Sequence, residues 1–215
     1  FPFRRYQVQP VWRGERAQAG RYRQFYQFDI DTIGDTTLPL AADAEVLAAA
    51  YIALTQLGIG KFTMRISNRK LINALLRYFG FSDTPAAIKI IDDWDKVPEE
   101  LTFEKLGQLT SSEKLSQFLN IIREPLKYLP PDFPDEEVRN ATLEITDVLN
   151  MTTLLIGKNK TESDLRVNLT IVRGLDYYTG TVVETRLHAA PELGSIMSGG
   201  RYDNLTASLG KKVMP

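Results

Sequence analysis

The sequence predicts an α+β fold, in which a mostly antiparallel sheet flanked by helices is interrupted by a helical insertion domain. Two observations support this. Polar and apolar residues alternate before residue 68 and again after residue 160, as in half-buried strands. Between these positions the apolar residues recur at helical spacing, with breaks such as LPPDFP. We therefore divide the chain into a first core part (1–67), a helical insertion (68–160) and a second core part (161–215).

The first two elements are expected to be strands that form a hairpin. The stretch RYQVQPVW is rich in residues that favour strands, and Pro10 within it favours an edge position or a bulge. In QFYQFDIDTI the side chains of Gln27, Asp29 and Asp31 fall on one face and apolar side chains on the other. The polar run RGERAQAGRYR between them is expected to be the loop.

The later elements follow from the same patterns. AADAEVLAAAYIALTQLG has helical periodicity and ends in glycine, and KFTMRIS returns to strand character. Residues 68–160 are expected to be nearly all helical. LRVNLTIV, YYTGTVVETRL and GSIMSGG are three candidate strands, and RYDNLTASLG is expected to close as a short helix. Such an insertion serves either a partner or substrate, or only the stability of the core.

Composition narrows the possible chemistry. The 215 residues are 43% hydrophobic, enough for a sizeable core, and the net charge of −1 gives no overall attraction to nucleic acid or membranes. There is no cysteine and one histidine, His188, which excludes disulfides, thiolate nucleophiles and multi-histidine metal sites. No apolar run approaches the roughly 20 residues that span a bilayer. We expect a soluble, cytoplasmic protein.

Positive charge is concentrated in the hairpin. The first 34 residues of the chain contain six arginines and no lysine, which favours bidentate recognition of a phosphate or carboxylate. Gln27, Asp29 and Asp31 offer acceptors for an ammonium or amide donor. Together these residues describe a site for something like an amino acid bound next to ATP. The alternative is that the arginines are solvated or paired at the surface and that the aspartates protect a strand edge from aggregation.

Three stretches resemble a known family. YQVQPVWRGERAQAGRYRQFYQFDIDTIG resembles motif 2 of class II aminoacyl-tRNA synthetases in the form typical of histidyl-tRNA synthetases. RGLDYYTGTVVE and SGGRYDNL resemble the two histidine-specific signatures of that family. The three occur in the family's order, with a helical insert between the first and the second. The resemblance implies a class II synthetase-type sheet and covers essentially the whole chain, across the insert only in pattern.

The resemblance also implies a reaction. The carboxylate of L-histidine attacks the α-phosphorus of ATP, pyrophosphate leaves, and the histidyl group moves to the 3′ end of tRNA(His). The implied partners are ATP, Mg²⁺ and a second copy of the full-length protein. No side-chain nucleophile is required, because arginines and Mg²⁺ stabilise the charge that moves toward pyrophosphate.

Roles for the charged residues follow from the resemblance. Arg13 is expected to bridge the histidine carboxylate and the α-phosphate, and Arg173 is expected to approach the α-phosphate. Arg21 is expected to meet the distal phosphates of ATP, and Glu15 to lie close to the adenine.

The residues implied to bind histidine come from both ends of the chain. Gln27 and Asp31 are expected to hold its α-amino group, with Asp31 as a charged acceptor. Tyr178 and Tyr202 are expected to line the imidazole pocket, where their hydroxyl groups offer hydrogen bonds and their rings exclude water.

Neighbouring residues receive weaker assignments. Gly174 and Gly180 are expected to let the backbone approach the ligand closely. Tyr177 is interpreted as a packing residue, because adjacent strand residues face opposite sides. The role of Asp176 is left open. His188 is interpreted as an ordinary residue at a strand end.

Some positions depart from the family pattern. Ala17 replaces a usual proline, Val183 a common phenylalanine and Asn204 a common glycine, and Asp31 stands where glutamate is frequent in bacteria. None of these changes removes a catalytic charge.

The segment Trp94 to Lys96 resembles a recurrent family element, to which we assign a structural role. Lysines and arginines of the insert either touch the tRNA acceptor stem or form a solvated face.

Whole motifs of the family are expected to lie outside these residues. Motif 1, with the dimer interface, would precede Phe1, motif 3 would follow Pro215, and the anticodon-binding domain would also lie outside these residues. A chain limited to these residues is expected to activate histidine weakly or not at all. The main rival is the non-catalytic, histidine-sensing regulatory subunit of ATP phosphoribosyltransferase. Two further rivals are a synthetase-like domain of a stress-sensing kinase and a class II synthetase for another amino acid.

Overall fold

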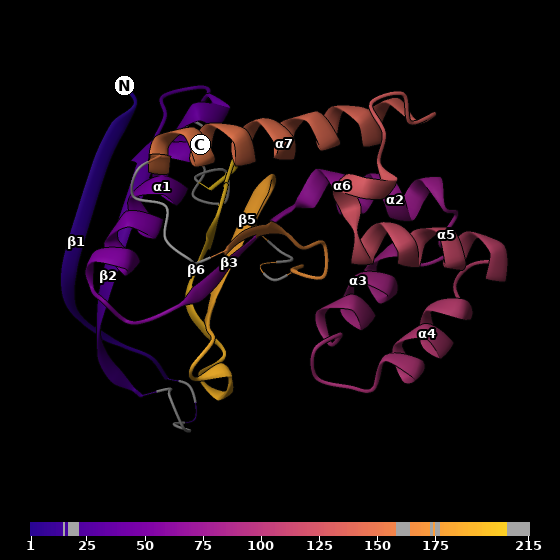
Figure 1. Ribbon diagram of the computed structural model, residues 1–215, viewed down its shortest axis with the longest axis horizontal. Helices are drawn as coiled ribbons and strands as arrows, with labels where there is room; N and C mark the ends of the chain where they lie inside the picture. The colour runs from indigo at the N-terminus through magenta and orange to yellow at the C-terminus, as the bar shows by residue number, and fades with distance from the viewer. Residues whose placement is uncertain (15, 17–21, 158–163, 173, 175–176, 206–215) are drawn as a thin grey trace.

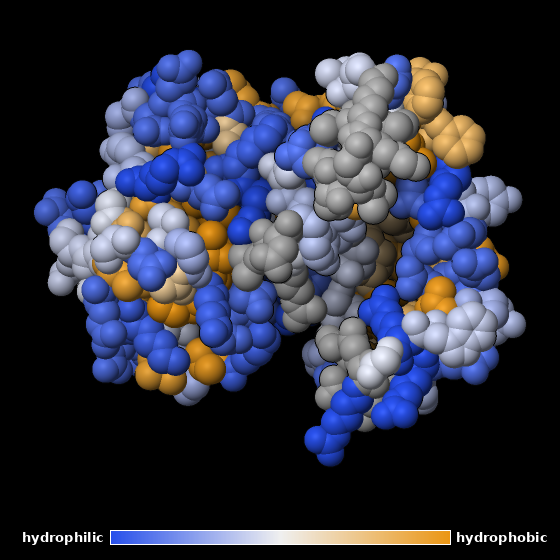
Figure 2. Space-filling view, turned by 180° about the vertical axis from the view of Figure 1, so that it is seen from behind, coloured by the Kyte–Doolittle hydropathy of each residue, from blue (hydrophilic) through white to orange (hydrophobic). Residues whose placement is uncertain are grey.

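The computed structural model of the protein describes residues 1–14, 16, 22–157, 164–172, 174 and 177–205. A long hairpin lies on one side of a central sheet and a group of short helices on the other (Figure 1). From behind, the helical lobe and the lobe that carries the hairpin are separated by a notch at one edge of the molecule (Figure 2). In the described part of the chain, every helix is too short or too polar to cross a membrane.

The predicted hairpin is confirmed. Strand β1 (Phe3–Trp12) pairs antiparallel with β2 (Gln24–Ile33) along its whole length. Pro10 is accommodated because β1 pairs on one side only, as its position in a two-stranded ribbon allows. Contrary to the expectation of a single sheet, these two strands form a ribbon of their own, and no described strand of the central sheet pairs with them.

The central sheet has four strands in the order β4-β3-β5-β6. These are β3 (Phe62–Asn68), β4 (Asp164–Val167), β5 (Thr181–Leu187) and β6 (Ser195–Gly200). The β3–β4 pair is parallel and the other two pairs are antiparallel, so the predicted mostly antiparallel sheet is confirmed.

Strand β4 is shorter than the predicted strand LRVNLTIV. It ends at Val167 because the side chain of Asn168 turns the backbone. The Asn168 side-chain oxygen accepts hydrogen bonds from the backbone nitrogen of Thr170 at 2.9 Å and from the Thr170 hydroxyl at 2.6 Å. Such local bonds offer the backbone an alternative to a strand ladder.

Two long helices cover one face of the central sheet. Helix α1 (Leu40–Gln56) packs along α7 (Glu136–Ile156), and α7 also contacts β3 (Figure 1). Alternate residues of β3, among them Phe62 and Met64, are buried on this side. The opposite face of the sheet is turned toward the insert and is the more polar one.

The predicted helical stretch contains five shorter helices before α7. They are α2 (Arg69–Tyr78), α3 (Thr84–Asp92), α4 (Glu99–Gly107), α5 (Ser112–Arg123) and α6 (Pro125–Tyr128). Asn68 ends β3 and caps α2, because its side-chain oxygen accepts hydrogen bonds from the backbone nitrogens of Lys70 and Leu71. One continuous apolar cluster runs through the sheet and these helices. Because this cluster contains residues from both sides of the predicted domain boundaries at 67/68 and 160/161, it does not mark those boundaries, and they stay a prediction.

The last expected element lies only partly within the described residues. Residues 201–205 form a bend and a turn and not the start of a helix, and the rest of RYDNLTASLG lies outside the described residues. A short 3-10 turn, η2 (Pro191–Leu193), connects β5 to β6.

Candidate functional site

One face of the hairpin carries a connected row of polar side chains. Opposed residues of an antiparallel pair share a face, and Gln7 is opposite Asp29 and Arg5 opposite Asp31. The Gln7 amide donates to one oxygen of Asp29 at 2.9 Å, and the Gln27 amide donates to the other. The two acceptor groups of Asp29 are thus both occupied, which fixes the orientation of Gln27.

The carboxylate of Asp31 contacts Arg5. One of its oxygens lies 2.7 Å from an Arg5 guanidinium nitrogen, close enough for an ion pair. That oxygen has no partner that satisfies the angles of a hydrogen bond. We regard the contact as an ion pair, because charge attraction depends on distance more than on angle. Both side chains are partly exposed, so the pair can open at little cost.

Arg13 lies where the two strands meet their loop. Its backbone nitrogen donates to the carbonyl oxygen of Arg23 at 2.8 Å, and its guanidinium donates to the side-chain oxygen of Gln27 at 3.1 Å. The same guanidinium lies over the ring of Phe25, 5.1 Å from the centroid. Three of the residues implied by the resemblance, Arg13, Gln27 and Asp31, therefore share one surface. Glu15 and Arg21 lie outside the described residues.

The polar row is the more covered face of the hairpin. Along β2 the side chains of Gln27, Asp29 and Asp31 are half-buried. On the opposite face Tyr6 and Tyr26 are 75% and 76% exposed. A surface hairpin normally turns its apolar face to the core, and here the polar row is the face that is turned inward.

Three tyrosine rings form a second cluster. The rings of Tyr177 and Tyr202 are stacked with centroids 5.4 Å apart, and Tyr178 lies 4.8 Å from Tyr202. The interpretation that Tyr177 and Tyr178 face opposite sides is wrong. They precede β5 in a turn, where strand alternation does not apply, and their centroids are 4.5 Å apart. Burial, supported by the contact with Tyr202, raises the pKa of Tyr178, so its hydroxyl remains protonated.

Glycines make room for the Tyr178 ring. Gly174 has φ +71°, and a Cβ atom there would lie 2.1 Å from the ring. A Cβ atom on Gly200 would lie 2.7 Å from the ring and 2.7 Å from the carbonyl oxygen of Thr181. The expectation that Gly174 and Gly180 let the backbone approach a ligand closely stays a prediction, and the structure shows that protein side chains also need the space beside both glycines. Beside Gly180 the space is taken by Arg201, whose Cδ would lie 3.0 Å from the added Cβ.

Arg201 holds the loop that carries Tyr202. Its guanidinium donates to Asp43 at 2.8 Å and to Asp203 at 2.7 Å. The Thr179 hydroxyl donates to the other oxygen of Asp203 at 2.6 Å. Burial alone would raise the pKa of Asp203, but the hydrogen bonds from Thr179 and Arg201 outweigh it and lower this pKa. Burial raises the pKa of Asp43, and Arg201 offsets this only in part.

Sequence patterns did not predict this anchor. The charged residues themselves are visible in the sequence, since an arginine and an aspartate flank Tyr202 in GGRYD. The periodicity of the sequence does not indicate which residue of a distant helix pairs with the arginine. That partner, Asp43, lies in the first turn of α1. Two residues later, Glu45 makes a bidentate contact with Arg4 of β1 at 2.7 and 3.0 Å. Helix α1 thus holds the tyrosine cluster and the hairpin through neighbouring carboxylates.

The structure assembles the candidate site in two described parts. The hairpin contributes Arg13, Gln27 and Asp31, and the second core part contributes Tyr178 and Tyr202. Among the described side chains, no hydrogen bond or ion pair joins the polar row directly to the tyrosines, and α1 provides the link. Arg173 and Asp176 lie outside the described residues. His188 directly follows the last residue of β5 and is exposed, and one of its ring nitrogens lies 2.8 Å from the Thr63 hydroxyl oxygen.

Comparison with known proteins decides the family. A family model described as Histidyl-tRNA synthetase matches residues 2–214. The chain belongs to the histidyl-tRNA synthetase family. Its similarity to the histidine–tRNA ligase of Clostridium acetobutylicum is 38% identity over 219 residues, covering 100% of this chain and 51% of that protein. The chain spans about half the length of the curated relatives it matches.

Solved structures support the synthetase fold. The histidyl-tRNA synthetase from Nostoc sp. PCC 7120 is 33% identical, with a TM-score of 0.85 over 100% of this chain and 51% of that one. A Bacillus halodurans protein described as an ATP phosphoribosyltransferase regulatory subunit/histidyl-tRNA synthetase is 25% identical. Its TM-score is 0.78, over 100% of this chain and 55% of that one. The mixed fold, with a sheet flanked by helices, is that of the synthetase catalytic domain.

Proposed function

We propose that this chain is part of the catalytic core of a histidine–tRNA ligase. The whole protein would convert L-histidine and ATP to histidyl-adenylate and transfer the histidyl group to tRNA(His). It would act as a cytoplasmic homodimer. The proposal is supported by the family match and by relatives described as histidine–tRNA ligases. Because the chain spans half of those relatives, the 215 residues alone are expected to activate histidine weakly or not at all.

The polar row of the hairpin carries the proposal. An amino acid next to ATP presents an ammonium group, a carboxylate and phosphates within a few ångströms. The row presents acceptors at Gln27 and Asp31 and a guanidinium at Arg13, connected through Gln27. Charge-assisted hydrogen bonds of this kind are shorter and stronger than neutral ones. Asp31 would receive the ammonium group in place of, or beside, Arg5.

Arginines would perform the electrostatic work of activation. Two anions, the carboxylate and the α-phosphate, must be brought together before the carboxylate oxygen attacks phosphorus. Arg13 is suited to bridge them because its guanidinium is held between Gln27 and Phe25. We further propose that Arg173 meets the α-phosphate and Arg21 the distal phosphates, with Glu15 close to the adenine. Fixed positive charge at these points stabilises the transition state as charge moves toward pyrophosphate.

The tyrosine cluster would select the side chain of the substrate. Tyr178 and Tyr202 offer hydroxyl groups beside a flat apolar surface, which suits an imidazole ring. A tyrosine hydroxyl is protonated at neutral pH and can donate a hydrogen bond, and the raised pKa of Tyr178 extends this to more alkaline solution. A pocket that hydrogen-bonds its substrate strongly rejects analogues without the polar atom.

Magnesium is expected with ATP. Among the described residues, no three His, Asp or Glu side chains converge in a way that would hold a metal ion. Mg²⁺ is commonly held by substrate phosphates with one or two carboxylates, so we expect it to enter with ATP.

Calorimetry would test the proposal. The whole protein that contains this chain is titrated with histidine and with a non-hydrolysable histidyl-adenylate mimic. The mimic is expected to bind at least a hundredfold more tightly than histidine, and Arg13→Gln or Arg173→Ala to remove most of that gain. Arg77→Gln is the matched control, because Arg77 pairs with Glu137 in the insert, away from the hairpin.

The same titration separates the rival function. Histidine binding without any gain from the adenylate group, and without an effect of Arg13→Gln, would indicate a histidine-sensing regulatory subunit. That function remains the second candidate because the Bacillus halodurans neighbour is described by both names.

A further inference from the structure

A chain of hydrogen bonds, with an ion pair at one end, runs through the polar row of the hairpin. It joins six side chains from the two strands and from the residue after β1. In order along the row these are Asp31, Arg5, Gln7, Asp29, Gln27 and Arg13. Asp29 lies between the two glutamines, and an arginine lies beyond each glutamine.

Both glutamines turn their nitrogens toward Asp29. The Gln7 amide donates to one carboxylate oxygen at 2.9 Å, and the Gln27 amide donates to the other. On the far side of Gln7, its oxygen accepts a hydrogen bond from Arg5 at 2.9 Å. On the far side of Gln27, its oxygen accepts one from Arg13 at 3.1 Å. The two amides are therefore arranged in the same way about one carboxylate.

The neighbours of each amide leave it a single orientation. A guanidinium carries only donors and a carboxylate only acceptors, so a glutamine between them must turn its oxygen to the arginine and its nitrogen to the aspartate. If Gln27 were reversed, its nitrogen would face Arg13 and its oxygen would face Asp29. Both hydrogen bonds would be lost, and like partial charges would meet at both ends. Asp29 is thus the acceptor that sets the direction of both glutamines.

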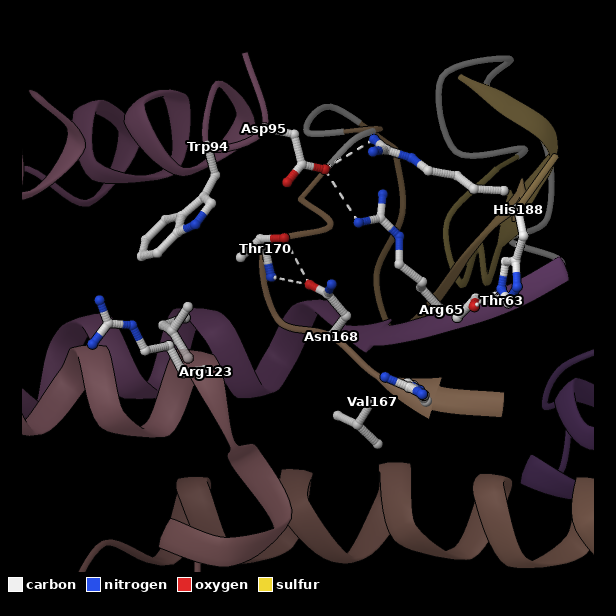
Figure 3. A pocket seen from close by; sticks show the side chains of 12 residues that line it. Thr63, Arg65, Trp94, Asp95, Arg123, Val167, Asn168, Thr170 and His188 are labelled. Atoms are coloured by element: carbon white, nitrogen blue, oxygen red, sulfur yellow. Dashed lines mark hydrogen bonds and ion pairs between the residues drawn. The ribbon is translucent and has the colours of Figure 1, made fainter. Parts of the chain in front are cut away.

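The same rule is visible at another amide of the fold. Figure 3 shows the side-chain oxygen of Asn168 facing Thr170, beside the pocket between the central sheet and the insert. The backbone nitrogen of Thr170 can only donate, and it lies 2.9 Å from that oxygen. One neighbour of fixed polarity is therefore enough to orient an amide. At Asn168 the neighbour is backbone, whereas at Gln27 the neighbours are side chains that mutation can change.

The orientation of Gln27 matters for a ligand that carries an ammonium group, because an ammonium group has donors and no acceptor. In the proposed function the Gln27 oxygen receives the α-amino group of histidine. That oxygen accepts one hydrogen bond from Arg13 and has a second lone pair for the ligand. A reversed Gln27 would present its own NH₂ group to the ammonium group and repel it.

The contacts of Asp29 favour an indirect role. Each of its oxygens already accepts a hydrogen bond from a glutamine, and its side chain is half-buried within the row. The sequence pattern alone groups Asp29 with the direct acceptors of an ammonium group. In the structure its carboxylate faces the two amides, so its effect on a ligand would pass through Gln27.

We propose that Asp29 is a positioning residue for amino-acid recognition, which keeps the Gln27 oxygen turned toward the α-ammonium group of the substrate. The inference rests on the proposed function, which supplies that ligand. It gives Asp29 a part in selecting an amino acid over an acid of the same shape that lacks the amino group.

The test separates recognition of the ammonium group from recognition of the rest of histidine. The whole protein is assayed by histidine-dependent exchange of pyrophosphate into ATP, with imidazole propionate, which is histidine without its amino group, as a competitive inhibitor. The inhibition constant divided by the KM for histidine measures the preference for the ammonium group. Asp29→Asn should lower this ratio by about threefold or more through KM, because an asparagine no longer fixes Gln27 in one orientation. The kcat should change by less than about twofold, because the acceptor acts in binding.

A double-mutant cycle shows whether Asp29 acts through Gln27. Gln27→Met removes the amide at nearly constant volume and should itself lower the preference for the ammonium group. In that background Asp29→Asn should have no further effect, because no amide is left to orient. A further loss as large as the one in the wild-type background would mean that Asp29 attracts the ammonium group directly, and would overturn the inference.

Gln7 provides a rescue from the other strand. In the double variant Asp29→Asn/Gln7→Glu, the new carboxylate accepts from the NH₂ group of the new asparagine, whose oxygen then faces the Gln27 nitrogen again. The preference should return to within about twofold of the wild-type value. A double variant no better than Asp29→Asn alone would contradict the proposed orientation. Asp93→Asn is the matched control, because Asp93 pairs with Lys96 in the insert, and it should leave the ratio unchanged.

Failure of the inference differs from failure of the proposed function. Histidine-dependent exchange by the wild-type protein reports the proposed function alone. Exchange with an unchanged ratio in Asp29→Asn rejects only the role of Asp29. Absence of exchange in the wild-type protein rejects the proposed function, and with it the ammonium ligand of Gln27.

Discussion

A guanidinium nitrogen of Arg201 and a carboxylate oxygen of Asp43 lie 2.8 Å apart, although 158 positions separate these residues in the sequence. Both side chains are almost fully buried. The pair joins the loop of Tyr202 to the first turn of α1. The position of the tyrosine cluster therefore depends on a helix from the other end of the chain.

Breaking this pair is expected to destabilise the fold. Asp43→Asn leaves part of a buried guanidinium charge uncompensated and should lower the free energy of unfolding by about 3 kcal/mol. Glu45→Gln is the control, because Glu45 lies on the same helix as Asp43 but pairs with Arg4 of β1 at the surface, and it should cost less than about 1 kcal/mol. Urea denaturation of both variants measures the difference. Equal losses would show that burial of the pair is unimportant.

Two adjacent glycines should respond differently to alanine. In Gly200→Ala the new methyl group would lie 2.7 Å from the Tyr178 ring, so the ring must move and histidine binding should weaken by at least tenfold. In Gly199→Ala the methyl group meets only the Val183 side chain, at 3.8 Å, and binding should stay near the wild-type value. Calorimetry with histidine distinguishes them. Similar affinities for the two variants would mean that Tyr178 does not shape the pocket.

Acid should weaken the anchor through Asp203. Its pKa in the folded protein is lowered from 3.8, so its contribution to stability is present above pH 3.8 and is lost as the pH falls below that value. At pH 7, Asp203→Asn should be less stable than the wild type. Urea denaturation at a series of pH values should show this gap closing below pH 4. A gap that is constant across the series would contradict the assignment.

The apolar face of the hairpin should promote self-association of the isolated chain. Val8 and Phe28 are cross-strand partners there, and the rings of Tyr6 and Phe28 are in edge contact with centroids 6.4 Å apart. Light scattering of the double variant Val8→Lys/Phe28→Lys should show less concentration-dependent association than the wild type. Leu154→Lys, at an exposed leucine on α7, is the control. An effect of the control as large as that of the double variant would argue against a local patch.

Local patterns predicted the elements well. The hairpin strand 24–33 has the predicted bounds, and α1 lies within two residues of its predicted ones. Alternation and helical spacing are properties of neighbouring residues, so they survive folding largely unchanged. The positions of side chains relative to one another in space were harder to predict. That Tyr177 and Tyr178 stand together depends on a turn and on Gly174, which strand alternation does not describe.

Long-range pairing was not predictable from one sequence. The partner of Arg201 depends on where α1 packs. The ion pairs of Asp95, which follows α3, with Arg65 of β3 and Arg186 of β5 likewise join three segments. The separation of the hairpin from the central sheet also depends on packing and not on strand pattern. The residues of the candidate site were chosen by family resemblance, and the structure shows which elements hold those that it describes.

Strand β3 has consequences for synthesis. Both of its neighbours, β4 and β5, follow it in the chain, and the second begins more than one hundred residues later. At about 5–20 residues per second, a ribosome needs on the order of ten seconds to deliver β5. During this interval both edges of β3 stay open while the helices of the insert, which depend on nearby contacts, can already form. The nascent chain is most exposed to chaperones and to misfolding in that period, and faster translation of residues 69–180 would shorten it.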